Sequence, residues 1–297
     1  MRRLLVCLGL LISGAASAQM DAIYSTYPFN PLALNPAYAG SRDVTSMTFI
    51  NRRRSVMYRN TYSSQYLTVD TPAGERFGLG FQAFRDAYSV ASVGFYGSLS
   101  YKYKFSETQY LSIGTQLGVT QVVPPNNYVG NNVYPFSLGL GIQYKTSRFY
   151  VGLSSQNLTG STIYANTSYA YDNASPVFLT AGYVATLTED VMLKTATVIK
   201  TLHSDVKADL NATLWYHKLG LGLWYQSSTK DLSGRAGILG TAELQLGDKF
   251  RIGASHDFNA KTSGNLSFDT AESTIWQFFL RYEFDNGSGK VGQMRYF

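Results

Sequence analysis

The side chains best suited to acid–base chemistry in this sequence are its three histidines, His203, His217 and His256. His256 is followed by Asp257, and a histidine beside a carboxylate can serve as a general base in a hydrolase. However, the histidines fall in separate predicted elements, and neither Gly-x-Ser-x-Gly nor His-Glu-x-x-His occurs. His256 also continues the outward-facing series Phe250, Ile252 and Ala254. We therefore expect no catalytic site and no metal site, with a hydrolase centred on His256 as a minor alternative.

A second group with binding chemistry is the arginine cluster Arg52, Arg53, Arg54 and Arg59. Guanidinium groups bind phosphate oxygens through paired hydrogen bonds. In the fold predicted below, the cluster lies at the outer end of the first strand and in the loop after it. There it would meet lipopolysaccharide phosphates, so we predict a contact with outer-membrane lipid; a binding site for a protein partner is the alternative.

A third group is the segment from Tyr24 to Gly40, which contains two Asn-Pro steps, Asn30-Pro31 and Asn35-Pro36. Asparagine is a good helix N-cap and proline a good first helical residue, so two short turns are predicted that end at Gly40. Apolar side chains on such an irregular segment need cover. These are Phe29, Leu32, Leu34 and Tyr38. The segment either plugs the periplasmic mouth of a barrel or offers a docking surface to periplasmic proteins, and both alternatives remain open.

The elements that must position these groups are predicted to be strands, because apolar and polar residues alternate along most of the chain. Residues 91–105 show this most clearly, with Val93, Phe95 and Leu99 on one face and small or polar residues on the other. About fourteen such segments occur, at 44–53, 61–71, 76–85, 91–105, 108–122, 135–145, 148–157, 176–187, 190–201, 206–216, 218–227, 234–247, 249–258 and 275–284. Most have about 10 residues, which suffices for a tilted strand to cross a membrane.

The first residues predict the compartment. Arg2 and Arg3 precede the apolar run 4–12 and the small residues Ala16-Ser17-Ala18, a pattern typical of a secretory signal peptide, residues 1–18. Cleavage would remove Cys7, the single cysteine, and with it any disulfide or thiolate chemistry. It would also lower the net charge from +6 to +4 by removing two arginines. That mild charge does not favour nucleic acid as a partner.

The composition favours a chain whose surface is covered largely by lipid: charged residues are 15% and aromatic residues 14%. No later segment is apolar for long enough to form a membrane-spanning helix, which leaves a closed barrel. The fold class predicted is therefore all-β, an antiparallel transmembrane β-barrel of 14 strands over residues 44–284. Residues 19–43 and the tail 285–297 are expected on the periplasmic side, because the long connections 123–134, 158–175 and 259–274 all follow odd-numbered strands.

Paired glycines recur within the predicted strands. They are Gly78 and Gly80, Gly139 and Gly141, and Gly220 and Gly222. A dinucleotide-binding glycine motif would require a following helix, and none is predicted. We therefore expect these glycines to pack inside the barrel and to bind no cofactor.

Residues 29–40 read Phe-Asn-Pro-Leu-Ala-Leu-Asn-Pro-Ala-Tyr-Ala-Gly and stand between the signal peptide and an arginine-bearing first strand. This pattern resembles the signature of the PorP/SprF family of outer-membrane proteins. The sequence departs from the family pattern at Arg54-Ser55, where relatives typically carry Gln-Trp after the first-strand arginine. Family members belong to, or work with, the type IX secretion system of Bacteroidetes, which is also linked to gliding motility.

The resemblance implies a cell outer membrane protein that docks or anchors secreted surface proteins. The implied partners are a secreted client with a C-terminal sorting domain and periplasmic components of the secretion machine. The residues expected to contact partners are Tyr27, Phe29, Asn30, Pro31, Leu32, Leu34, Asn35, Pro36, Tyr38, Gly40, Arg295, Tyr296 and Phe297. A passive outer-membrane channel, or a porter for hydrophobic substrates, is the alternative function.

Overall fold

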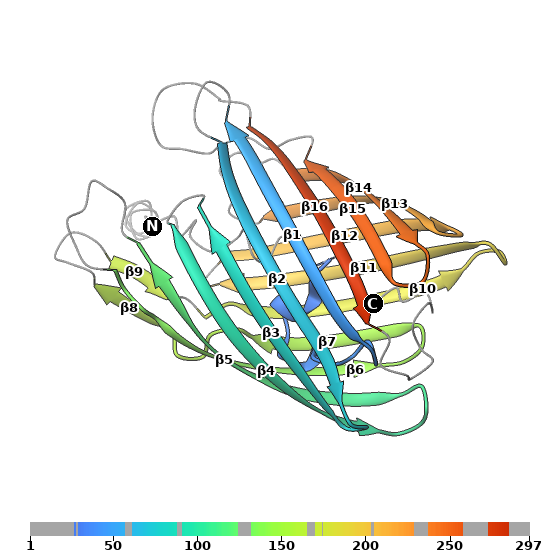
Figure 1. The fold of residues 1–297 in the computed structure, drawn as a ribbon, viewed down its shortest axis with the longest axis horizontal. Helices are drawn as coiled ribbons and strands as arrows, with labels where there is room; N and C mark the ends of the chain where they lie inside the picture. The colour runs from blue at the N-terminus through green and yellow to red at the C-terminus, as the bar shows by residue number, and fades with distance from the viewer. Residues whose placement is uncertain are drawn as a thin grey trace, which may run out of the picture.

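The computed structural model describes residues 27, 29–56, 61–87, 91–123, 132–164, 170–173, 175–202, 205–228, 237–257 and 273–284. The predicted signal peptide 1–18, Arg59 and the tail 285–297 lie outside the described residues. Fourteen antiparallel strands form a closed barrel (Figure 1). Within the described ranges, no helix has the length and apolar character that a membrane crossing requires.

Each strand of the wall pairs with the next wall strand along the chain, and β1 pairs with β16 to close the ring. The wall strands are β1 (Thr45–Val56), β2 (Thr61–Ala73), β3 (Phe77–Asp86), β4 (Ser92–Lys104), β5 (Tyr110–Val122), β6 (Phe136–Lys145), β7 (Phe149–Ser155), β10 (Val177–Thr186), β11 (Val191–Leu202), β12 (Asp205–Tyr216), β13 (Leu219–Ser228), β14 (Gly237–Leu246), β15 (Phe250–Asp257) and β16 (Ser273–Phe284). All fourteen predicted segments correspond to these strands, with ends displaced by a few residues. The predicted barrel is confirmed.

The long connection predicted at 158–175 has structure of its own. It contains two further strands, β8 (Ser161–Tyr164) and β9 (Ala170–Asn173), which pair with each other and stand outside the closed ring. Each has only four residues. Four residues is the shortest length over which alternation of residue types can indicate a strand, so the signal is weak.

The alternation in the sequence sorts side chains between the two faces of the wall. Large apolar residues such as Phe95, Leu99 and Leu221 are exposed on the outer surface, while small and polar residues such as Ser98 and Gln116 are buried inside. Exposed aromatic residues gather near the tight turns. These are Tyr101, Tyr103, Phe105, Tyr216, Phe250 and Phe284. This outer face has the apolar band and aromatic edge of a membrane barrel.

Connections of different length gather at the two ends of the barrel. One end carries the tight turns at 74–76, 105–109, 146–148, 187–190, 217–218 and 247–249, together with the start of β1 and the end of β16. The other end carries the three longest connections, at 123–135, 156–176 and 258–272, although 57–60 and 203–204 are short there as well. Bacterial barrels place tight turns in the periplasm, so we expect the first end to be the periplasmic one.

Residues 29–44, which directly precede β1, lie within the ring of strands (Figure 1). They form two 3-10 helices, η1 (Pro31–Ala33) and η2 (Pro36–Tyr38), which confirm the two predicted turns. Their side chains are buried, with exposed fractions of 1% for Phe29, 2% for Leu32 and 3% for Tyr38. The barrel therefore has no empty core, because part of its own chain fills it.

Candidate functional site: the plugged lumen

Residues 29–43, here called the plug, owe their shape to the Asn-Pro steps and to one glycine. The Asn35 side chain accepts a hydrogen bond of 2.9 Å from the backbone N–H of Ala37, as an N-cap does. Asn30 precedes η1 but makes no such cap; its amide instead donates to Thr68 on β2 at 2.7 Å. Gly40 has φ +65°, a conformation that favours glycine. This glycine turns the chain from the plug toward β1.

Apolar side chains of the plug enter aromatic clusters on the inner wall. Phe29 stacks on Phe279 of β16 with ring centroids 4.2 Å apart, and Tyr38 meets Tyr150 of β7 edge-on at 5.8 Å. Just before the plug, Tyr27 meets Trp224 of β13 at 4.7 Å. Burial raises the pKa of the Tyr38 phenol well above its ordinary value, so this hydroxyl stays protonated. These contacts anchor the plug to widely separated strands.

The backbone of the plug is held by side chains of the wall. Six of its carbonyl oxygens, those of Phe29, Leu32, Leu34, Ala39, Gly40 and Ser41, accept hydrogen bonds from wall residues. Most of the donors lie on β3 to β7 or just beyond. They are Gln82, Ser100, Lys102, Tyr110, Lys145, Ser154 and Gln156. A buried backbone carbonyl without a hydrogen-bond partner costs free energy. The wall side chains supply these partners only when the plug has this one conformation.

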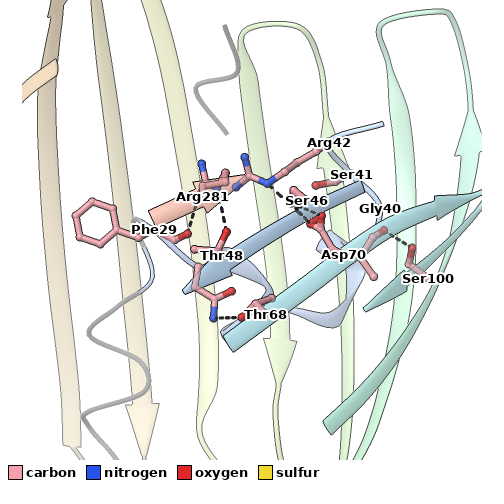
Figure 2. Close-up of polar contacts among 12 residues, drawn as sticks. Phe29, Gly40, Ser41, Arg42, Ser46, Thr48, Thr68, Asp70, Ser100 and Arg281 are labelled. Atoms are coloured by element: carbon pink, nitrogen blue, oxygen red, sulfur yellow. Dashed lines mark hydrogen bonds and ion pairs between the residues drawn. The ribbon is translucent and has the colours of Figure 1, made fainter. Parts of the chain in front are cut away.

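Charged side chains complete the attachment near the periplasmic end (Figure 2). Arg281 of β16 donates to the carbonyl oxygen of Phe29 at 2.6 Å and to the hydroxyl of Thr48 at 3.1 Å. Arg42 of the plug lies 3.9 Å from a carboxylate oxygen of Asp70 on β2, which also accepts from Ser46 at 2.9 Å. Because β1 pairs with β16 on one side and with β2 on the other, the plug is bound on both sides of the seam where the barrel closes.

Glycines of the inner wall leave the space in which the plug lies. A methyl group at Gly78 would overlap the carbonyl group of Ala39, and one at Gly141 would overlap the side chain of Asn35. A methyl group at Gly114 would likewise overlap the backbone of Pro36 and Ala37. The predicted interior position of the Gly-x-Gly pairs is therefore confirmed, and Gly78, Gly80 and Gly141 among them leave room for the plug.

Little space remains between the plug and the wall. Two interior cavities each measure about 30 Å³, room for only a few water molecules. One lies against β10 to β16 and is lined by the charged residues Arg42, Lys194, Glu243, Arg251 and Arg281. Neither cavity is large enough for a drug-sized ligand, which needs a few hundred Å³.

The structure brings most of the predicted partner-contact residues together and separates the predicted lipid contacts. The described residues from Phe29 to Gly40 all belong to the plug and lie inside the barrel, whereas Arg295, Tyr296 and Phe297 lie outside the described residues. Strand alternation divides the arginine cluster. Arg53 is exposed on the outer face, while Arg52 and Arg54 share the inward face with the buried Ile50.

His256 lies where the sequence places it, on the outer face of β15. Its ring stacks on Trp276 of β16 with centroids 4.2 Å apart. His217 lies in a tight turn at the periplasmic end, 3.7 Å from the carboxylate of Asp190. In the described part of the chain, no three residues among His, Cys, Asp and Glu gather as a metal site would require.

The sequence interpretation missed the wall residues that hold the plug, above all Asp70, Lys102 and Arg281. A signal was present, since each is a charged residue at an inward position of an alternating strand. Charges facing a barrel interior either line water or meet a partner. The choice between these two roles required the position of the plug.

The family described as type IX secretion system membrane protein PorP/SprF matches residues 16–282, which include the plug and nearly all of the barrel. No curated protein matches the chain. Among solved structures, the monoaromatic hydrocarbon channel CymD is 12% identical with a TM-score of 0.56, over 86% of this chain and 93% of that one. A FadL homologue of Pseudomonas aeruginosa is 13% identical with a TM-score of 0.51, over 88% and 94%. The outer membrane protein Omp33 of Acinetobacter baumannii is 11% identical with a TM-score of 0.50, over 82% and 99%. At these identities the likeness concerns the fold alone.

Proposed function

The chain belongs to the PorP/SprF family of type IX secretion system membrane proteins, and from this premise we propose that it docks secreted proteins at the cell surface without catalysing a reaction. Its barrel lies in the outer membrane, as the family and the fold indicate. The proposed client is a secreted protein with a C-terminal sorting domain. The other proposed partners are periplasmic components of the secretion machine.

The observation that carries this proposal is the plug. Its backbone is bound by side chains of several wall strands and by Arg281 across the closing seam. Each such hydrogen bond contributes about 1 kcal/mol and more where a charge takes part, so together they hold the segment firmly. A lumen filled in this way is poorly suited to passing a protein or a solute. Partner binding is then left to the two ends of the barrel.

Each end of the barrel offers a distinct surface. The periplasmic end carries the tight turns and the attachment points of the plug and of the tail 285–297. We assign this end to the secretion machine. The opposite end carries the connections 156–176 and 258–272, and the first of these includes the hairpin β8–β9. We assign these connections to the client protein, because long outer loops are the usual recognition elements of such barrels.

The proposal predicts specific partners in a pull-down from native outer membranes. The tagged full-length protein, solubilised in mild detergent after crosslinking, should recover a large secreted protein and periplasmic secretion components, identified by mass spectrometry. Deleting residues 286–297 should reduce the recovery of periplasmic components and leave the client. Replacing residues 258–272 by a short Gly-Ser linker should do the reverse. Recovery of the barrel alone from crosslinked membranes would contradict docking.

The alternative of a passive channel has one observation in its favour, the likeness of the fold to a hydrocarbon channel. It requires an open path, and the cavities beside the plug are small. Conductance of the full-length protein in planar bilayers distinguishes the two functions. A steady conductance of porin size would support the channel, and a silent bilayer would support docking.

The absence of catalysis is part of the proposal. His256 stacks on an exposed tryptophan at the outer surface of the wall, which is a common setting for a membrane-facing aromatic contact. Replacing it as His256→Ala should leave client recovery unchanged. Loss of a lipase or esterase activity in that variant would instead support the minor alternative.

A further inference from the structure

The charged side chains on the wall strands are distributed unevenly between the two faces. Nearly all take inward positions, and they include Asp70, Lys102, Lys194, Glu243, Arg251, Arg281 and Glu283. The two exceptions among the described strands are Arg53 on β1 and Arg85 on β3, both exposed. By strand alternation they share the outer face with Phe49 and Phe81. Two charges on an otherwise uncharged face require an explanation.

The two arginines belong to one continuous patch. β2 lies between their strands and presents Ser63 opposite Arg53 and Gln65 opposite Arg85. Asn51 lies opposite Gln65 on β1. The hydroxyl of Ser63 accepts a hydrogen bond of 3.1 Å from the Gln65 amide and a longer one of 3.5 Å from the Asn51 amide. We call these five residues the outer polar patch.

The charge of this patch is positive and uncompensated within the described strands. Asp86, which follows Arg85, points the other way and accepts a hydrogen bond from Ser64 at 2.7 Å. The described residues supply no ion-pair partner to Arg53 or Arg85. The neighbouring residues on the same face are serine, asparagine and glutamine, none of which carries a neutralising charge. The patch therefore combines two positive charges with neutral hydrogen-bonding groups, which suits an anion that also carries hydroxyl groups.

The depth of the patch in the membrane follows from its position on the strands. It occupies the ends of β1 to β3 away from the tight turns, directly beyond the apolar residues Phe49, Leu67 and Phe81 of the same face. An arginine facing lipid costs about 2–4 kcal/mol at the bilayer centre but only about 0–1 kcal/mol near an interface. Trp276, opposite Arg53 on β16 and exposed, is a typical interfacial residue. These features place the patch at the headgroup level of the outer leaflet.

We propose that the outer polar patch binds the phosphorylated sugar headgroup of lipopolysaccharide. The guanidinium groups of Arg53 and Arg85 take phosphate oxygens, since such groups form paired hydrogen bonds with them. The amides and hydroxyl between them suit sugar hydroxyls. The apolar residues of β1 to β3 lie where the acyl chains of the same lipid would extend. A protein partner is less suited to the patch, because the patch continues the lipid-covered band of β1 to β3.

The test compares a double variant with a matched inward control. Arg53→Gln with Arg85→Gln removes both charges from the outer face, while Arg52→Gln removes a charge one residue away that faces the lumen. The full-length proteins are purified in detergent, checked for folding by heat-modifiable gel mobility, and titrated with lipopolysaccharide by native mass spectrometry. We expect the double variant to bind roughly tenfold less tightly, as loss of charge-assisted hydrogen bonds implies, and the control to bind as the parent does.

Three outcomes would overturn the proposal. One is equal lipopolysaccharide binding by the parent and the double variant. Another is an unchanged lipid content together with loss of a crosslinked protein from the double variant, which would make the patch a protein interface. A titration with inorganic phosphate alone separates binding of the lipid from binding of a free anion, and tight binding of phosphate without the lipid would also count against the proposal. Client recovery in the pull-down is measured in parallel, because client docking and lipid binding are separate proposals and either can fail without the other.

Discussion

At the scale of single residues, the close fit between glycines and plug is a matter of volume. Gly78 and Gly141 leave no room for even one methyl group. Interiors packed in this way respond to an added methyl group by shifting backbone, at a cost of about 1–3 kcal/mol. The overlap at Gly78 is with the backbone of Ala39, which cannot move aside as a flexible side chain could.

Replacing Gly78 by alanine should therefore destabilise the folded barrel while Gly97→Ala should not. Gly97 lies on β4, and a methyl group there would meet nothing within 4 Å. The temperature at which the barrel loses its fast, folded mobility on unboiled gels measures the difference. We expect a clear decrease for Gly78→Ala and no decrease for Gly97→Ala. Equal decreases in the two variants would show that the plug does not determine the packing.

The arginine cluster shows how far single residues could be placed from the sequence. The cluster Arg52, Arg53 and Arg54 reads as one basic site, yet consecutive strand residues point to opposite faces. The alternation around Phe49 and Ile50 contains that information, so the separation of Arg53 from its neighbours was predictable. The partnership of Arg53 with Arg85 was not, because it depends on the pairing of β2 with both β1 and β3.

At the scale of elements, the plug behaves as a piece of core supplied by the chain itself. Removing residues 29–42 would leave glycines, Gln82, Ser100 and Lys102 facing an empty and polar lumen. The wall strands retain all their backbone hydrogen bonds in that case, since those run between strands. The deletion should therefore open the barrel without dissolving it.

We expect the variant lacking residues 29–42 to insert into planar bilayers and to conduct ions, where the full-length protein is silent. It should also unfold at a lower temperature, because aromatic contacts such as Phe29 with Phe279 are lost. A scrambled segment of the same length and composition is the control for chain length. If the deletion variant inserts and stays silent, something other than the plug closes the lumen.

The elements differ in how well the sequence predicts them. Long strands were predicted correctly because ten or more alternating residues give a strong signal, and the two turns at Pro31 and Pro36 follow from their Asn-Pro steps. The short hairpin β8–β9 gave too little signal to be predicted. The position of the plug inside the barrel was one of two open alternatives, since apolar residues on an irregular segment suit burial or a partner equally well.

At the scale of the whole molecule, the two ends of the barrel must face different compartments. The tight turns predict that Glu107, between β4 and β5, faces the periplasm, and that Asn126, between β5 and β6, faces the outside. Cys7 is the single cysteine and lies in the predicted signal peptide. An introduced cysteine would then be the lone thiol of the mature chain.

A membrane-impermeant maleimide should label Asn126→Cys on intact cells and Glu107→Cys only after the outer membrane is permeabilised. The physical reason is that the reagent cannot cross the lipid that covers the apolar outer face. Labelling is read by mass shift of the purified protein, with the cysteine-free parent as the blank. The reverse labelling pattern would show that the barrel has the opposite orientation, and the assignments of the two docking surfaces would then be exchanged.

The attachment of Arg281 to Phe29 joins residues 252 positions apart in the chain. The plug emerges from the export pathway first and the strand that carries Arg281 last, so the contact can form only when synthesis and export are complete. Since β16 also closes the ring against β1, sealing the wall and trapping the plug become a single late event of biogenesis. We therefore expect an unplugged barrel to be at most a brief stage of assembly in the outer membrane.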